Sequence, residues 1–502
     1  MDLSGLLIDA INRHRAGDHA GVAELCAEVL ALSPDNPTAL RLAGLSHADP
    51  MTGRVLLERA HAARPDHLPT ALALALALLR TREPAAALAI ADPITRHDPE
   101  SASAWFVAGT AYSALGRTPE AVAALSVAQR LDPDHAETAT NLGNALLDAD
   151  DLVGAELWLR RAITIDGGQP ETWASLAFLL AGRGCATEAV AACDTALKLR
   201  PGFATAHWNR AYARLLDGDH ARAWDDFEWR WADRHPPHGT PPGPRWDGRD
   251  PPDGRLLVLA EQGLGDTLQF VRFLPALASR MAVTLVCPAG LHRLLAGMPI
   301  ELRAPGPVLP ADPWINLMSL PRLLGTTAET IPGAAGYLSR PPAPPRRRPR
   351  VGLVWRGNPL HSNDRRRSLP TEPLRPLTEI DGIELVSVQV GPLAHQAMGV
   401  LGIPTLGARN RDWADTADLI ATCDLIIAAD TSTAHLAGAM GVPVWVMLPF
   451  MPDWRWGIFR ADTPWYASAR LFRQRGPGDW STVVAEVAAA LRRDDWPAPT
   501  AQ

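Results

Sequence analysis

The chain has 502 residues and a formal net charge of −7 at pH 7, with 47% hydrophobic and 21% charged residues. This length exceeds one ordinary domain and predicts a globular protein of two or three domains. The negative net charge excludes a general electrostatic attraction to nucleic acid or anionic membranes, so we expect no nucleic-acid partner.

The cysteines and the apolar runs indicate a cellular compartment. Five cysteines lie scattered along the chain without a Cys-x-x-Cys pair, a pattern typical of reduced thiols rather than of disulfides or a zinc site. The longest apolar run, residues 71–79, is well short of the ~20 residues that span a membrane. The amphipathic, acid-containing N-terminus does not match a signal peptide. We therefore expect a cytoplasmic protein with no transmembrane segment.

Residues 1–233 contain an internal repeat. Its markers are three prolines and one glycine that stand 34 residues apart: Pro99, Pro133, Gly167 and Pro201. Before the marker at 133, bulky, small and aromatic residues are spaced as in tetratricopeptide repeats (TPRs): Trp105, Ala108, Gly109, Tyr112, Gly116, Ala121 and Ala128. Pro34 and Pro65 mark two earlier copies, the second shortened by three residues.

The repeat predicts an α-solenoid. Small residues let two short helices approach closely, and the proline ends the second helix because it cannot continue the hydrogen-bond ladder. One such hairpin cannot bury its apolar face alone, so stacked copies share a core. We count about six full hairpins and a partial seventh; a generic helical bundle is the alternative. Since TPR arrays resemble one another in offering a concave groove to a protein segment, we expect a protein partner.

The second half predicts alternating strands and helices. A Pro/Gly-rich linker at 234–253 precedes a first lobe at 254–340, and a Pro/Arg-rich linker at 341–350 precedes a second lobe at 351–492 with a tail at 493–502. Plausible helices separate a series of short β-rich runs. These runs stand at 255–260, 283–287, 300–304, 351–355, 383–390, 424–430 and 442–448. This alternation predicts two α/β lobes with parallel sheets, whose ligands bind at the carboxyl ends of the strands.

The first candidate site is "EQGLGDTLQF" at 261–270. Gly263 and Gly265 permit a tight turn and close approach of a ligand. Asp266, at the start of the next helix, would repel a phosphate, so it either caps the helix or accepts a proton from a hydroxyl group. We expect an acceptor-side loop formed by Gln262, Gly263, Gly265 and Gln269.

The second candidate site is the segment after the run "DLIIAAD". Hydroxyl side chains and exposed N–H groups at a helix mouth form a natural diphosphate site. We expect the donor to bind to Asp430, Thr431, Ser432, Thr433, Ala434 and His435. Asp430 could also cap the helix, and His435 could also be a core histidine.

The third candidate site is "VWRGNPLHSNDRRRSLP" at 354–370. Arg356 follows directly on a predicted strand, and Asn358 stands two residues further on. Arginine presents a planar fork of donors that suits phosphate, so we expect Arg356 and Asn358 to contact the donor. The triple arginine at 365–367 is either a further phosphate contact or a solvated loop.

A cluster of aromatic residues follows in a loop-like stretch, "PFMPDWRWGIFRADTPWYASARLFRQ" at 449–474. Its members are Trp454, Trp456, Trp465 and Tyr466. They either stack on a base or sugar ring or seal the core between the lobes.

These motifs resemble those of a GT-B glycosyltransferase of the heptosyltransferase type, glycosyltransferase family 9. The resemblance covers roughly residues 254–490 and rests on Gly265–Asp266 and on "DTSTAH", in which Ser432 replaces the family's glycine. It implies that Asp266 is the catalytic base, that the loop at 430–435 binds the donor, and that Arg356 is the basic residue after the first strand of the second lobe. TPRs joined to a GT-B domain resemble the layout of enzymes that glycosylate proteins, such as O-GlcNAc transferases and bacterial flagellin glycosyltransferases.

The expected function is transfer of a sugar from a nucleotide-sugar donor to a protein hydroxyl, flagellin being one candidate acceptor. No Asp-x-Asp stands at a plausible strand end, so we expect a metal-independent enzyme without a cofactor. The alternatives are a saccharide- or lipopolysaccharide-type glycosyltransferase whose array recruits a partner, and a TPR scaffold whose transferase domain has lost catalysis.

Overall fold

The computed structural model describes residues 3–232, 240–249, 254–306, 309–339, 346–361, 363–391 and 397–493. The chain forms two compact units, Met1–Leu179 and Leu180–Gln502, and each is described by itself. The segments 234–239, 250–253, 341–345 and 494–502 of the predicted linkers and tail lie outside the described residues.

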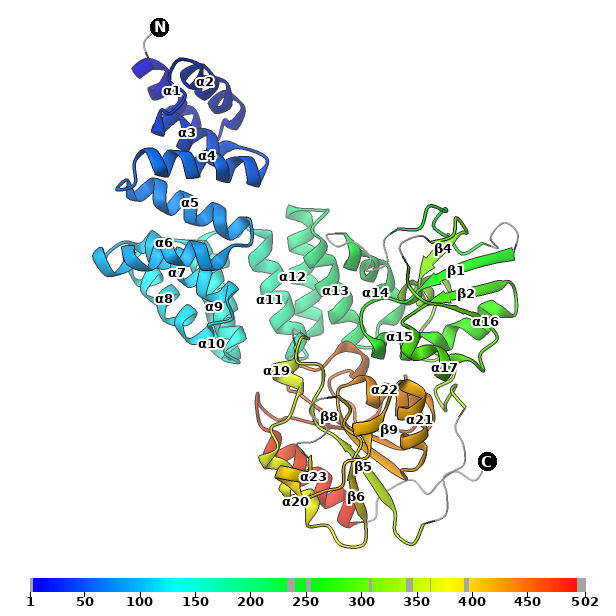
Figure 1. The fold of residues 1–502 in the computed structure, drawn as a ribbon. Helices are drawn as coiled ribbons and strands as arrows, with labels where there is room; N and C mark the ends of the chain where they lie inside the picture. Colours follow the sequence, from blue (N-terminus) through cyan, green and yellow to red (C-terminus); the bar gives the residue numbers. More distant parts are fainter. Residues whose placement is uncertain are drawn as a thin grey trace. The chain divides into compact units, whose positions relative to one another are not determined.

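Unit 1 is a stack of helical hairpins (Figure 1). Its helices are α1 (Leu3–Arg15), α2 (His19–Leu32), α3 (Pro37–Ser46), α4 (Pro50–Ala63), α5 (Leu68–Arg80), α6 (Pro84–His97), α7 (Ala102–Ala114), α8 (Thr118–Leu131), α9 (Ala136–Asp148) and α10 (Leu152–Ile165), followed by α11 (Pro170–Gly182), in which the division between the units falls. The shortened copy corresponds to α3, which has 10 residues where α5, α7 and α9 each have 13.

Two glycines show why the repeat needs small residues where its helices meet. A Cβ atom on Gly109 would lie 2.6 Å from Leu125 Cγ, and one on Gly143 would lie 2.7 Å from Leu159 Cγ. Leu125 and Leu159 are themselves fully buried. Any side chain at either glycine would therefore push apart the two helices of a hairpin.

Unit 2 contains the last hairpins of the solenoid and both α/β lobes (Figure 1). The hairpin helices are α12 (Ala186–Leu199), α13 (Ala204–Leu216) and the short α14 (His220–Phe227), which continues into the 3₁₀ turn η1 (Glu228–Trp231). The predicted partial seventh hairpin corresponds to α13 with α14.

The first lobe has a four-stranded parallel sheet in the order β3-β2-β1-β4. Its strands are β1 (Arg255–Leu259), β2 (Ala282–Val286), β3 (Glu301–Arg303) and β4 (Trp314–Asn316). Helices between them are α15 (Leu264–Phe270), α16 (Leu274–Ala278) and α17 (His292–Leu295), and α18 (Leu320–Leu323) follows β4. The described part of the first linker is held at the sheet edge, where the Trp246 N–H donates to Trp314 O at 2.7 Å.

The second lobe has a five-stranded parallel sheet in the order β6-β5-β7-β8-β9. Its strands are β5 (Arg350–Val354), β6 (Glu384–Ser387), β7 (Leu425–Ala429), β8 (Val444–Leu448) and β9 (Ala469–Arg473). Its helices are α19 (Asp364–Arg367), α20 (Arg375–Thr378), α21 (Trp413–Ala421), α22 (Ser432–Ala439) and α23 (Trp480–Arg492). The side chains of β7 and β8 are buried along both strands, as expected for a parallel sheet covered on both faces.

The predicted fold class, a TPR solenoid followed by two sets of parallel sheets, is confirmed. Two strands were not predicted. β4 has only three residues and stands in a proline-rich segment. β9 lies within the stretch 449–474, which we interpreted as loop-like. Among the described residues, no helix is long and apolar enough to cross a membrane.

Candidate functional site

The two predicted loops meet in unit 2. Helix α15 follows β1 of the first lobe, α22 follows β7 of the second, and the two helices pack against each other (Figure 1). The contact is close at Gly265, where a Cβ atom would lie 2.9 Å from His435 Cδ2 and 3.4 Å from Ser432 Oγ. The N-termini of α15 and α22, which follow the carboxyl ends of strands from two different sheets, therefore form one site.

Asp266 has two roles in this arrangement. One carboxylate oxygen accepts the Gly263 N–H at 2.7 Å, so the side chain does cap its own helix. The other oxygen forms an ion pair with Arg455, which comes from the second lobe. Burial raises the pKa of the Asp266 carboxyl above its ordinary value, against the opposing effects of Arg455 and the Gly263 N–H. A raised pKa brings a carboxyl group closer to the range that suits a general base.

Arg455 connects the two lobes through two acceptors on the first lobe and is also bound within its own. Its guanidinium donates to Asp266 and to Gln269 Oε1 on α15, and to Asp453 Oδ1 at 2.8 Å. The side chain is only 7% exposed, and the centre of the Trp454 ring lies 4.3 Å from the guanidinium carbon. Arg455 thus places a buried positive charge, with each guanidinium nitrogen donating to an acceptor, at the contact between the lobes.

The donor-side loop presents a buried hydroxyl and a buried acid. Thr431 is the N-cap of α22, yet its side chain makes no capping bond and Oγ1 has no partner among the described residues. Since Thr431 is only 7% exposed, a buried hydroxyl without such a partner is unusual and is a candidate contact for a ligand. Burial, with the nearby Asp453 carboxylate, raises the pKa of Asp430 to about 6. Thr433 and Ala434 are buried within α22, and Ser432 is half-buried.

His435 is a packed histidine. Its Nδ1 lies 2.9 Å from the Tyr466 hydroxyl, its ring stacks on Trp456, and its Nε2 lies 3.9 Å from Asp430 Oδ1. Burial and nearby arginines hold the pKa of His435 well below its usual range, so the ring is neutral at pH 7. Of the two alternatives for His435, the geometry favours the core histidine.

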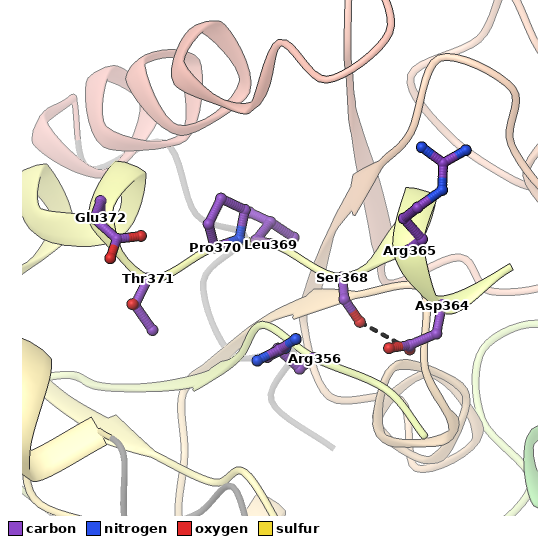
Figure 2. A pocket seen from close by; sticks show the side chains of 8 residues that line it. All are labelled: Arg356, Asp364, Arg365, Ser368, Leu369, Pro370, Thr371 and Glu372. Carbon is purple, nitrogen blue, oxygen red and sulfur yellow. Dashed lines mark hydrogen bonds between the residues drawn. The ribbon is translucent and has the colours of Figure 1, made fainter. Parts of the chain in front are cut away.

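Arg356 lies in a pocket of about 420 Å³ at the end of β5. Figure 2 shows its guanidinium beside a continuous segment that supplies the other lining residues, Asp364, Arg365, Ser368, Leu369, Pro370, Thr371 and Glu372. Ser368 Oγ donates to Asp364 Oδ1 at 2.8 Å and accepts the Gly357 N–H at 3.1 Å. The Gln389 side chain holds the backbone of Arg356 through two hydrogen bonds. The Arg356 side chain is then left to face the pocket.

The triple arginine does not form one solvated loop. Arg365 is exposed and lines the pocket, whereas the Arg367 side chain is 14% exposed and lies 3.6 Å from Asp364 Oδ1. Asn358 is exposed, and its side chain closes a local turn by accepting the Leu360 N–H at 3.0 Å.

The four residues of the expected acceptor-side loop separate into two pairs. Gln262 and Gly263 are exposed, and Gln262 has a φ of 58°, a left-handed conformation that is uncommon for a residue other than glycine. Gly265 and Gln269 are buried, and Gln269 is bound to Arg455.

The aromatic residues seal the core between the lobes. Trp454, Trp456, Trp465 and Tyr466 are at most 3% exposed. Trp454 packs against Trp465 of its own loop, Phe270 of α15 and Trp224 of α14. Of the two alternatives for this cluster, the structure supports packing rather than stacking on a ligand.

Sequence reasoning missed Arg455 and Glu261, although both stand in stretches that it considered. Arg455 lies between two tryptophans in "DWRW", and Glu261 directly precedes the Gly-rich turn. A charged residue inside or directly after an apolar or aromatic run is the signal that identifies both, because such a residue is buried only with partners.

The comparisons with known proteins bear on the repeats. A family model described as "Tetratricopeptide repeat" matches residues 72–136, 107–170 and 177–238. The first half therefore contains TPRs, as the 34-residue period predicted.

Among individual proteins, the chain is similar to Protein FlbA of Caulobacter vibrioides, with 27% identity across 96% of this chain and 83% of FlbA. It is also similar to TTC0263, a thermophilic TPR protein of Thermus thermophilus, with 24% identity and a TM-score of 0.33 over 36% of this chain and 98% of that one. MamA of Desulfovibrio magneticus RS-1 matches with 20% identity and a TM-score of 0.29 over 34% of this chain and 98% of that one.

Proposed function

We propose that this chain is a metal-independent glycosyltransferase that moves a sugar from a nucleotide-sugar donor to a hydroxyl group of a protein bound by the TPR array. The observation that carries the proposal is the contact of α15 with α22, which brings Asp266 of one lobe to the loop 430–435 of the other. A carboxylate and an anion-accepting helix mouth are the two groups that such a transfer needs.

In the proposed reaction, Asp266 accepts the proton of the acceptor hydroxyl as its oxygen attacks the anomeric carbon of the donor. The bond between that carbon and the nucleoside diphosphate breaks, and negative charge develops on the leaving phosphate. The first N–H groups of α22, the Arg356 guanidinium and the Thr431 hydroxyl, which has no partner in the described part of the chain, would stabilise this charge. Flagellin is a candidate acceptor; a saccharide acceptor, with the array recruiting a partner, is the variant of the same proposal.

A second function is favoured by one specific observation. Asp266 already accepts two hydrogen bonds, from Gly263 and Arg455, as a purely structural carboxylate would. A protein-binding TPR scaffold whose α/β unit no longer transfers sugar is therefore the competing proposal.

An activity assay separates the glycosyltransferase from the scaffold. The purified chain is titrated with a panel of nucleotide sugars, with and without candidate acceptor proteins, and release of nucleoside diphosphate is measured. The glycosyltransferase proposal expects release that Asp266→Asn lowers by about 10²–10⁴-fold. Asp381→Asn, an exposed aspartate in the second lobe, is the matched control and should retain full activity. Undiminished activity in Asp266→Asn would remove this residue from the mechanism, and the absence of release from every nucleotide sugar would favour the scaffold.

A further inference from the structure

The last hairpin of the solenoid contacts both segments that carry the Asp266–Arg455 pair. On one side, Arg230 and Trp231 of η1 bind Glu261, five residues before Asp266. On the other side, the Tyr212 hydroxyl of α13 donates to Pro452 O at 2.8 Å, three residues before Arg455. All of these residues belong to unit 2.

Glu261 is the centre of the first contact. Its carboxylate accepts hydrogen bonds from Arg230 Nε at 3.0 Å, Arg230 Nη2 at 2.7 Å, Trp231 Nε1 at 2.5 Å and the Met318 N–H at 2.9 Å. The side chains of Glu261 and Arg230 are 1% and 3% exposed. A buried carboxylate with four donors, two of them from one guanidinium fork, is held rigidly in place.

The turn that follows Glu261 has a demanding geometry. Gln262 has a φ of 58°, although it is not a glycine, and the Gly263 N–H must reach Asp266 Oδ2 at 2.7 Å. A left-handed conformation of a residue with a side chain persists only where its surroundings determine it. Glu261 directly precedes Gln262 and is held by fixed contacts, so it fixes the backbone at one end of the turn.

We infer that Glu261 is a positioning residue. Through Arg230 and Trp231, the last TPR hairpin sets the conformation of the turn at 262–266 and thereby the place of the Asp266 carboxylate against Arg455. The structural part of this inference concerns the turn alone; its catalytic consequence depends on the proposed function. The last hairpin would accordingly be part of the catalytic unit, in addition to any part it has in binding a protein.

The test uses the full chain with Glu261→Gln, which keeps the side-chain shape and removes the charge that Arg230 neutralises. The matched control is Asp225→Asn, which removes another ion pair between this hairpin and the first lobe, Arg322 to Asp225, at an exposed position. Hydrogen exchange of the peptide 262–270 is the first measurement, and the rate of sugar transfer as a function of donor concentration and pH is the second.

We expect Glu261→Gln to raise amide exchange in 262–270 by about 10-fold or more while exchange in 431–440 and in β7 stays unchanged. We expect kcat to fall by about 10- to 100-fold with the donor KM unchanged, because the donor-side loop is untouched and only the base is displaced. The acid limb of the pH–rate profile should shift as well, since it reports the carboxyl that the turn carries. Asp225→Asn should leave all of these measurements unchanged.

Unchanged exchange in 262–270, or an equal rise throughout unit 2, would overturn the inference. If Glu261→Gln does not fold, Trp231→Phe provides the same test, because it removes a single N–H donor to Glu261 and keeps an aromatic ring. If the wild-type chain transfers no sugar, the proposed function fails while hydrogen exchange still decides whether Glu261 holds the turn.

Discussion

Arg455 and Asp266 form a buried ion pair that joins the two α/β lobes of unit 2. The guanidinium also binds Gln269 and Asp453, so one cation contacts a carboxylate from each lobe. The candidate base of the proposed reaction therefore already has a cationic partner within the protein.

Arg455→Met should strongly destabilise unit 2. The substitution leaves Asp266 with no cation in a site where its side chain is 17% exposed, and the loss of one partner of a buried pair costs about 3–5 kcal/mol. Denaturant unfolding of the full chain should show this loss in the free energy of unfolding. Arg475→Met is the control: its side chain is 74% exposed and pairs with Glu486, so its removal should cost less than about 1 kcal/mol. Equal losses in the two variants would contradict the assignment.

Arg356→Ala should weaken nucleotide binding without changing stability. The Arg356 guanidinium faces the pocket at the end of β5 and makes no hydrogen bond or ion pair with the described residues, so its removal breaks no polar contact among them. Loss of a charge-assisted hydrogen bond to phosphate should lower the affinity for a nucleoside diphosphate by about 10-fold or more in calorimetry. Arg375→Ala, at an exposed position that does not line the pocket, should bind normally. Unaltered affinity in Arg356→Ala would place the phosphates elsewhere.

Asp430 should make the stability of unit 2 depend on pH in a specific window. Its pKa is raised from 3.8 to about 6 in the folded chain. The folded state therefore holds this proton more tightly, and the resulting stabilisation is complete below pH 3.8 and is lost as the pH rises to about 6. The free energy of unfolding of the wild type should thus fall relative to that of Asp430→Asn between about pH 4 and 6.

The control for the pH series is Asp462→Asn. Arg460 lowers the pKa of Asp462, so its contribution is present above pH 3.8 and is lost only below it. The difference in free energy of unfolding between the wild type and Asp462→Asn should stay constant between about pH 4 and 6, where the difference for Asp430→Asn changes. A constant difference for Asp430→Asn as well would show that the Asp430 carboxyl titrates normally.

Gly265→Ala should push apart the N-terminal ends of α15 and α22. The new Cβ would lie 2.9 Å from Cδ2 of His435, and that ring is held between Tyr466 and Trp456 and cannot move away easily. We expect a loss of about 1–3 kcal/mol in unfolding free energy, together with lower activity of the proposed glycosyltransferase. Gly297→Ala has no neighbouring atom within 4 Å of its Cβ and should be neutral. A fully stable and active Gly265→Ala would show that α15 and α22 need not touch.

Much of the architecture could be predicted locally. The 34-residue spacing of the repeat markers and the small residues Gly109 and Gly143 encode helical hairpins, because each hairpin is stabilised by contacts within itself and with its neighbour. Seven strands were visible as short apolar runs between helices. β4 and β9 were not, since a three-residue strand carries too little pattern and the aromatic residues around β9 obscure its alternation.

The sequence by itself determined the repeats, the parallel two-lobed fold and the two loops at strand ends, because these depend on periodicity and on turn chemistry over a few tens of residues. Only the tertiary structure decided which groups meet. Arg455 and Asp266 are 189 residues apart, and Glu261 meets Arg230 only because the last hairpin packs against the first lobe. The pairing of charges depends on burial and on distance in space, and neither quantity is contained in the local order of residues.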